Sequence, residues 1–228
     1  MQLSPRLRLA ADFCPRGALL ADVGSDHGKL PAALVAEGIC PSAIATDIGA
    51  GPVSRAEQTV LRHGLAENIS VRQCDGLTGV RPEECTVVSV CGMGGEVMEH
   101  ILTGSPWSFD KTLILQPQSK AEVLRACLYR NGVSIVKEVP VLDRGRCYSV
   151  LLAGRTQNVP PAPDDMPALL LGGIPSAPDS QAKRIYLEQL LFRQTQILHG
   201  IRCTGDEEAV ARQQRVISKV KEVIGTCR

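Results

Sequence analysis

The chain has 228 residues and a formal net charge of +1, and 44% of its residues are hydrophobic. This length can bury one α/β core and still carry a small appendage, and the apolar share excludes an intrinsically disordered chain. No apolar run reaches the roughly 18 residues of a membrane span, and no signal-peptide core precedes the first charges, so we expect a cytoplasmic protein.

The charge is unevenly distributed along the chain. Residues 181–228 hold nine Lys and Arg against five Asp and Glu, a net +4, whereas the remainder has a net −3. A basic appendage on a slightly acidic core is compatible with an RNA partner, and equally with an ordinary solvated helix surface.

Nine cysteines raise the question of a disulfide framework or a metal site. No pair shows the C-x-x-C spacing of a metal site, and the four histidines do not cluster with them. We expect most of these cysteines to be small buried side chains in a reducing compartment, and we expect no metal.

Short apolar runs alternate with helical stretches between residues 18 and 116. Strands are expected over 18–23, 42–47, 69–72, 86–90 and 112–116. Helices are expected over 30–37, 52–63, 119–129 and from the glycines after residue 91 to residue 102, besides a short one starting at Pro5. This alternation predicts a mostly parallel sheet covered by helices on both faces.

The last part of the sheet has a different pattern. Two strands, over 133–139 and 147–152, are joined through Asp143-Arg144-Gly145, a short connection that indicates a β-hairpin and not a helical crossover. The predicted fold is therefore α/β and Rossmann-like, with a C-terminal β-hairpin. Such a sheet resembles the class I methyltransferases more than the nicotinamide dehydrogenases.

The chain after this hairpin divides into two parts. Residues 156–180 contain six prolines and are expected to be a linker, and residues 181–228 to be an antiparallel α-helical hairpin with Gly200 and Gly205 on either side of its turn. The predicted domains are 1–155, 156–180 and 181–228. The two apolar stripes of the hairpin are Leu187, Leu190, Leu191, Gln194 and Leu198, then Val210, Gln213, Ile217, Val220 and Ile224.

The run Asp22-Val23-Gly24-Ser25-Asp26-His27-Gly28 follows the first expected strand. Glycines suit a loop whose backbone touches a cofactor, but Asp26 occupies the place of the second glycine of the dinucleotide fingerprint. Carboxylates repel a pyrophosphate and attract the ammonium and sulfonium groups of S-adenosylmethionine. The loop therefore favours S-adenosylmethionine over a dinucleotide, and a tight turn without a ligand is the alternative.

Three more segments follow later strands. Asp47, roughly 20 residues past the glycine loop, can accept hydrogen bonds from ribose hydroxyls, and Asp75 can accept one from an adenine amino group. Gly92-Met93-Gly94-Gly95 leaves room for a methyl acceptor. Each segment alone also fits a turn, but one nucleoside at the carboxyl ends of the strands explains all of them more economically.

Taken together, these motifs resemble those of the bacterial tRNA (adenine(22)-N1)-methyltransferase family. The resemblance spans most of residues 3–153, and the linker and helical hairpin resemble the C-terminal coiled-coil domain of that family. The sequence departs from the family pattern at Gly28, Asp47, Gly49 and Gln118, although Asp47 keeps a carboxylate and Gln118 an amide. The motifs are D-V-G-S-D-H at 22–27, Leu30-Pro31, Gly51-Pro52, D-G-L at 75–77, G-M-G-G at 92–95 and Gln116-Pro117.

The resemblance implies transfer of a methyl group from S-adenosylmethionine to N1 of an unpaired or extruded adenine in tRNA. Asp26 and His27 are the candidates for residues near the methionine moiety and the acceptor base. For Gln116 and Gln118 two roles stay open: they hold the base edge, or they satisfy backbone groups at a strand end. The expected cofactor-binding residues are Asp22, Gly24, Ser25, Asp26, Gly28, Asp47, Ile48, Asp75, Gly76, Leu77, Cys91, Gly92 and Met93. The expected phosphate contacts to RNA are Arg6, Arg8, Arg184, Arg193, Arg212 and Arg215.

Two other functions stay open. One is a methyltransferase with a small-molecule acceptor, in which the helical hairpin is a dimerisation device, and the other is a non-catalytic nucleoside-binding protein. For His27 the alternative is a helix-start residue bonded to backbone, and for Cys91 it is packing. We expect a monomer or a weak dimer that binds tRNA, with no membrane and no metal involved.

Overall fold

Seven strands form one sheet in the part of the chain that the structure, a computed structural model, describes, which is residues 1–156, 165–203 and 205–227. The strands are β1 (Leu19–Val23), β2 (Ser42–Asp47), β3 (Ile69–Gln73), β4 (Val87–Gly94), β5 (Thr112–Ser119), β6 (Ser134–Asp143) and β7 (Arg146–Gly154). The helices are α1 (Pro5–Asp12), α2 (Lys29–Ala36), α3 (Ala50–Arg62), α4 (Gly95–Gly104), α5 (Ala121–Arg130), α6 (Met166–Leu171), α7 (Gln181–Arg202) and α8 (Glu207–Thr226). Short 3-10 helices are η1 (Pro82–Glu84), η2 (Pro106–Asp110) and η3 (Ile174–Ser176).

The strand order is β3-β2-β1-β4-β5-β7-β6. Strands β1 to β5 pair in parallel, whereas β7 is antiparallel to both β5 and β6. Arg144 and Gly145 join β6 to β7 with φ angles of 50° and 76°, as a two-residue hairpin turn requires. The predicted Rossmann-like sheet with a final β-hairpin is confirmed, and its topological switch point lies between β1 and β4.

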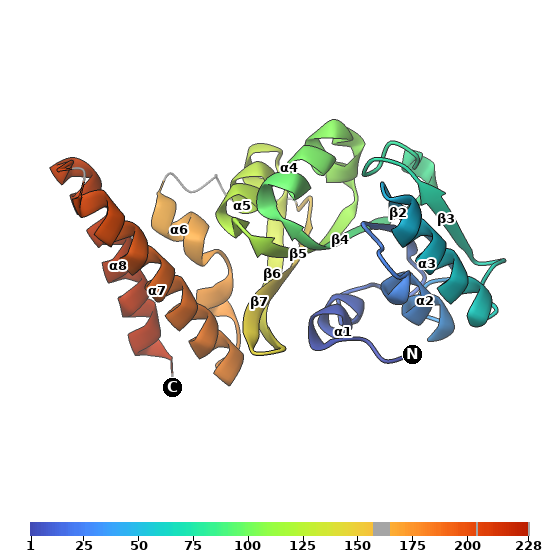
Figure 1. Cartoon of the computed structure of the whole chain (residues 1–228), viewed down its shortest axis with the longest axis horizontal. Helices are drawn as coiled ribbons and strands as arrows, with labels where there is room; N and C mark the ends of the chain where they lie inside the picture. Colours follow the sequence, from blue (N-terminus) through green and yellow to red (C-terminus); the bar gives the residue numbers. More distant parts are fainter. Residues whose placement is uncertain (157–164, 204, 228) are drawn as a thin grey trace.

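Helices cover both faces of this sheet (Figure 1). Helices α1, α2 and α3 pack on one face, where Leu34 belongs to the buried cluster, and α4 and α5 pack on the other, which includes Leu124. Successive residues of a buried strand point to opposite faces, so Leu20 joins the first cluster and Ala21 the second. The two cores fix the strand ends that carry the predicted site.

Strands β4 and β5 are longer than the sequence predicts. The apolar runs end at Val90 and Leu115, but pairing continues through a bulge to Met93 with Pro117 and Gly94 with Ser119. Glycines carry no apolar signal, yet their backbone still forms the ladder. The G-M-G-G segment is therefore the end of β4 and the start of α4, and not a loop.

Part of the expected linker is helical. Asp165 caps α6 by accepting a hydrogen bond from the backbone N–H of Ala168 at 3.1 Å, and Pro167 lies in the first turn. Leu170 is buried in a cluster that α6 shares with α7 and α8. The expectation of an irregular segment is thus wrong for α6, and residues 157–164 of that segment lie outside the described residues.

Helices α7 and α8 form the predicted helical hairpin, beside the sheet (Figure 1). Leu187, Leu190 and Val220 are buried in its interface, as their spacing predicts. The expectation that Gly200 borders the turn is wrong, because α7 continues to Arg202 and an exposed glycine costs a helix only about 1 kcal/mol.

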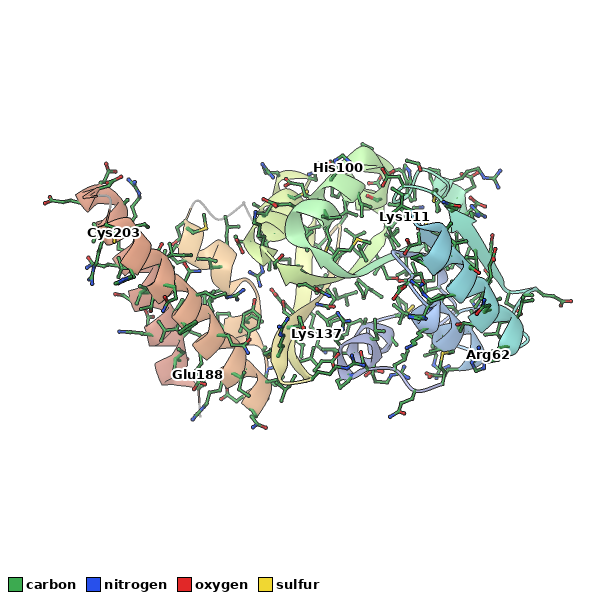
Figure 2. The ribbon with its side chains drawn as sticks, viewed as in Figure 1. Arg62, His100, Lys111, Lys137, Glu188 and Cys203 are labelled. Atoms are coloured by element: carbon green, nitrogen blue, oxygen red, sulfur yellow. The ribbon has the colours of Figure 1, made fainter. Side chains whose placement is uncertain are left out.

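The long axis of the molecule runs from α3 to the tip of this hairpin. Arg62, at the end of α3, and Cys203, just after α7, lie at opposite ends (Figure 2). Within the described ranges, none of the helices combines the length and apolar character of a membrane span. The same ranges hold no group of three His, Cys, Asp or Glu arranged to hold a metal ion. The nine cysteines are free thiols, and four of them are buried while Cys203 is exposed.

Candidate active site

A cavity of about 930 Å³ opens at the carboxyl ends of β1 and β4. Its other walls come from the start of the chain, α1 and the β6–β7 hairpin. The cavity thus lies at the switch point, where ligands of open α/β sheets bind. Six of the predicted cofactor-binding or positioning residues line it, namely Asp22, Gly24, Ser25, Asp26, His27 and Cys91.

Asp22 places a buried carboxyl group in the wall of the cavity. It pairs with Ser89 in the register of β1 and β4, and the Ser89 hydroxyl donates to Oδ1 at 2.5 Å. Burial raises the pKa of Asp22 to about 6, although hydroxyl groups of Ser25 and Ser89 act in the opposite direction. A cation bound in the cavity would stabilise the ionised form of Asp22.

Two buried hydroxyl groups in the same wall are unsatisfied. Ser4 Oγ and Ser25 Oγ make no hydrogen bond of normal geometry to any described residue, and both residues line the cavity. A buried polar group without a partner costs about 1–3 kcal/mol, so polar atoms of a ligand would be stabilised here. The cavity therefore fits the charged amino-acid end of S-adenosylmethionine. Ser4 precedes α1, but its side chain does not cap that helix.

Asp26 and His27 lie at the open side of the cavity. The Arg55 side chain of α3 donates a hydrogen bond to Asp26 Oδ1, and His27 Nε2 lies 3.3 Å from Oδ2. This bond to Arg55 lowers the pKa of Asp26. Asp26 is thus an ionised, exposed carboxylate paired with an arginine that no motif or spacing in the sequence indicates.

Hydrogen bonds connect the loops at the ends of β1, β2 and β3. The backbone N–H groups of Gly24 and Ser25 donate to the Thr46 carbonyl at 2.8 and 3.0 Å. Thr46 Oγ1 donates to the Gly76 carbonyl at 2.9 Å, and the Cys74 N–H donates to the Asp47 carbonyl at 3.0 Å. The structure therefore brings the predicted strand-end segments together at one edge of the sheet.

Not all of the predicted cofactor-binding residues line the cavity. Asp47, Asp75 and other expected contacts are not among the described residues that line it. Asp47 Oδ1 accepts from the Gly49 N–H at 2.9 Å, and the Asp75 side chain is exposed. The remaining expected contacts outside the lining are Gly28, Ile48, Gly76, Leu77, Gly92 and Met93.

Met93 and Leu77 explain part of this difference. Gly24 has a φ of +70°, a backbone conformation that favours glycine, and the Met93 methyl group lies against it, so the Met93 side chain covers the glycine loop. The Leu77 side chain is 2% exposed and belongs to the hydrophobic core. A contact from Leu77 to a ligand is therefore restricted to its backbone.

Gln116 does not offer its amide to a substrate in this structure. Its side chain is fully buried, Oε1 accepts from Arg6 Nη1 at 3.0 Å, and Nε2 donates to the Pro117 carbonyl at 3.0 Å. The bond to the Pro117 carbonyl agrees with the alternative role of Gln116, which is to satisfy a backbone group at a strand end. Gln118, two residues later, is exposed and lies beside Gly92.

Arg6 is part of the cavity and not a free surface cation. Besides Gln116, it contacts Asp143 Oδ2 at 3.3 Å and lies over the Tyr148 ring, 5.6 Å from its centroid. Cys91 is half-buried, and burial raises the pKa of its thiol. A protonated thiol is a poor nucleophile, which supports the packing alternative for Cys91.

The other expected RNA contacts fall into two groups. Arg8 pairs with Asp12 and Glu37, and Arg212 pairs with Glu208, so these guanidinium groups are already neutralised. The remaining three side chains are exposed and make no ion pair with a described residue; they are Arg184, Arg193 and Arg215.

Sequence reasoning missed the hairpin wall of the cavity. Asp143, Arg144 and Tyr148 line it, and the strand pattern around them gives no sign that the hairpin reaches the carboxyl edge of β1 and β4. The short connection between the two strands was the only available signal.

The strand order, the final hairpin and a ligand cavity at the switch point define a Rossmann-like methyltransferase. The family described as methyltransferase domain matches residues 3–151, and the chain belongs to this family.

Comparisons with individual proteins agree with this assignment. The chain is 39% identical over 155 residues to the tRNA (adenine(22)-N(1))-methyltransferase of Bacillus subtilis, covering 67% of this chain and 65% of that protein, which is less than two thirds of its length. The solved structure of the B. subtilis M1A22 tRNA methyltransferase TrmK is similar with a TM-score of 0.85 and 30% identity, covering 98% and 99% of the two chains. The structure of Streptococcus pneumoniae Sp1610, a putative tRNA (m1A22) methyltransferase in complex with S-adenosyl-L-methionine, has a TM-score of 0.83 and 30% identity, covering 98% of this chain and 100% of that chain.

Proposed function

We propose that the chain transfers the methyl group of S-adenosylmethionine to N1 of an adenine in tRNA, at position 22 as the name of the B. subtilis relative states. The observation that carries this proposal is the cavity at the switch point, with buried Asp22 and two unsatisfied hydroxyl groups in its wall. The similarity to two tRNA methyltransferase structures over nearly the whole chain supports the choice of tRNA.

The proposed cofactor contacts follow the strand ends. Asp22 would attract the cationic ammonium group, Asp47 would accept from the ribose hydroxyls, and Asp75 would accept from the adenine amino group. Asp47 and Asp75 lie at neighbouring strand ends outside the cavity lining. Because the Met93 side chain covers Gly24, contact of the cofactor with the glycine loop would require Met93 to move.

The reaction requires little acid–base chemistry from the protein. When bound, S-adenosylmethionine supplies a methyl group that its positive sulfur already activates. Adenine N1 has a lone pair in the ring plane, and its methylated product can exist as a cation, so no general base is needed. The residues of the cavity would orient the two partners and exclude water, with His27 and Gln118 beside the acceptor base.

The helical hairpin is proposed to contact the body of the tRNA. Arg184, Arg193 and Arg215 are exposed arginines of the hairpin that can meet phosphates. The proposed division is a catalytic domain over 1–155, a connecting segment over 156–180 and a tRNA-contacting hairpin over 181–228. We further propose a cytoplasmic location, where tRNA is modified, and a monomer or weak dimer.

The test is to incubate the full chain with methyl-labelled S-adenosylmethionine and unmodified tRNA, and to map the labelled nucleotide. Label at N1 of one adenine is expected, with no label in tRNA that already carries 1-methyladenosine there. Label transferred only to a metabolite would favour the small-molecule alternative. Tight binding of S-adenosylmethionine without turnover on any tRNA would favour the non-catalytic alternative.

A further inference from the structure

A second cavity, of about 230 Å³, lies between the β5–α5 connection, β7 and α7. We call it the α7 cavity. Helix α7 runs beside the β6–β7 hairpin (Figure 1), so the catalytic sheet and the helical hairpin both contribute to its wall. The residues that carry the argument are Gln118, Lys120, Tyr148, Leu190, Arg193 and Ile197.

The α7 cavity adjoins the cofactor cavity. Tyr148 lines both of them. Gln118 lines the α7 cavity, and its Nε2 lies 3.4 Å from the point where a Cβ of Gly92 would stand. Gly92 follows Cys91, which lines the cofactor cavity. The two cavities are therefore neighbours that share Tyr148 in their walls, as sites for two consecutive nucleotides of one strand would be.

The charges around the α7 cavity leave one cation available. Lys120 pairs with Glu96, and Arg125 pairs with Glu138. The Arg193 guanidinium is exposed and has no ion-pair partner in the described part of the chain. One carboxylate, that of Glu122, also lies in the wall. Arg193 is thus placed to meet a phosphate group at the rim.

The rest of the wall suits a nucleobase. Leu190 and Ile197 present apolar surface, Tyr148 presents a ring, and the Gln118 amide carries a donor and an acceptor. Single-stranded RNA is bound by stacking and apolar contact together with hydrogen bonds to base edges. The volume is below the roughly 300–1,000 Å³ of drug-sized ligand sites, which suits one base and not a larger ligand.

We propose that the α7 cavity binds the nucleotide adjacent to the methylated adenine, with the base against Ile197 and the phosphate at Arg193. The inference rests on the proposed function, since it requires an RNA substrate. It assigns α7 a direct part in presenting the target base, in addition to contact with the tRNA body.

The test measures kcat/KM of the full chain on unmodified tRNA. Ile197→Ala is compared with Phe192→Ala, an exposed apolar residue on α7 outside the cavity, and Arg193→Ala with Arg184→Ala on the same helix. Each variant is assayed on normal tRNA, on tRNA with an abasic nucleotide next to the target adenine, and on tRNA with a neutral methylphosphonate at the adjoining phosphate.

The two cavity variants are expected to lower kcat/KM about tenfold on normal tRNA with unchanged affinity for S-adenosylmethionine. Ile197→Ala should have no further effect on the abasic tRNA, nor Arg193→Ala on the methylphosphonate tRNA, because the contact is already absent. The control variants should change activity by the same factor on all three substrates. If a cavity variant lowers kcat/KM by the same factor on normal and on altered tRNA, the inference about the α7 cavity is wrong and the proposed function stands. If the wild-type chain is inactive on every tRNA, the proposed function is wrong as well.

Discussion

The Arg125 guanidinium and the Glu138 carboxylate form an ion pair that is shielded from solvent, with Nη2 2.5 Å from Oε1 and Nε 3.2 Å from Oε2. The side chains are 1% and 0% exposed. Arg125 also donates to the carbonyls of Leu169 and Leu170 at 2.7 and 2.9 Å, and to Tyr186 Oη at 3.2 Å. The pair therefore joins α5 and β6 of the catalytic sheet to α6 and α7.

Arg125→Met should be strongly destabilising, because it leaves the Glu138 carboxylate buried without its partner. Removing one partner of a buried pair typically costs about 3–5 kcal/mol in the free energy of unfolding. Guanidinium denaturation of the full chain measures this loss. A double variant, Arg125→Met with Glu138→Leu, should recover part of it, since neither charge then remains.

Arg130→Met is the matched control for this prediction. Arg130 lies on the same helix and pairs with Glu99, but its side chain is 62% exposed. An exposed pair contributes about 0–1 kcal/mol, so this variant should remain close to wild type. Similar losses for Arg125→Met and Arg130→Met would contradict the role given to burial.

Binding of S-adenosylmethionine should tighten as pH rises from 5 to 7. The pKa of Asp22 is raised to about 6 by burial, and a cationic ligand prefers the ionised carboxylate, so binding must displace a proton below that pKa. Calorimetry should show up to about a tenfold gain per pH unit below 6 and net proton release. Asp22→Asn should abolish this dependence, while Asp26→Asn should preserve it, because the pKa of Asp26 is already lowered.

The same raised pKa has a consequence for the ligand-free protein. Folding favours protonated Asp22, so the contribution of Asp22 to stability is fully present below its ordinary pKa near 4 and is lost as pH rises through about 6. Asp22→Asn should therefore flatten the stability profile between pH 4 and 6. An unchanged profile would show that the carboxyl group is solvated in solution.

Asp47→Ala and Asp75→Ala should each weaken cofactor binding about tenfold, the effect of losing one or two hydrogen bonds to a ligand. Isothermal titration with S-adenosylmethionine measures the change, and Asp110→Ala, an exposed carboxylate paired with Arg155, is the control. Unchanged affinity in both variants would mean that the ligand occupies only the cavity around Asp22, and the strand-end assignment would then be wrong.

The fold was predictable because its signals are local. Each buried strand is a short apolar run, and the short connection Asp143-Arg144-Gly145 contains a glycine that suits a hairpin turn. The parallel sheet and its final hairpin therefore follow from the sequence. The place of Asp22 and Gly24 in the cavity wall was predictable for the same reason. They lie at the carboxyl end of a strand, and ligands of open parallel sheets bind at such ends, beside the switch point.

The missed features depend on contacts between distant segments. Arg6 donates a hydrogen bond to Gln116, which lies 110 residues later in the chain, and packs over the ring of Tyr148 in β7. No rule of sequence spacing therefore indicates that Gln116 lies in the cavity wall. The sequence pattern around Arg125 is that of an exposed arginine on a helix, whereas in the structure α6 covers its side chain. Such pairings arise from tertiary packing, which a single sequence does not record in its periodicity.

Arg215→Glu should weaken tRNA binding while leaving S-adenosylmethionine affinity unchanged. Arg215 is an exposed residue of α8 without an ion-pair partner among the described residues, and each lost phosphate contact lowers the salt dependence of log K by about 1. Binding to unmodified tRNA over a range of salt concentrations measures that slope. Arg62→Glu makes the same charge change at the opposite end of the molecule (Figure 2) and should leave the slope unchanged.

A point substitution is preferable to deleting residues 156–228, because the deletion would also remove the carbonyl groups that bind Arg125. If both substitutions reduce the slope equally, the effect comes from net charge and the helical hairpin is not the tRNA contact.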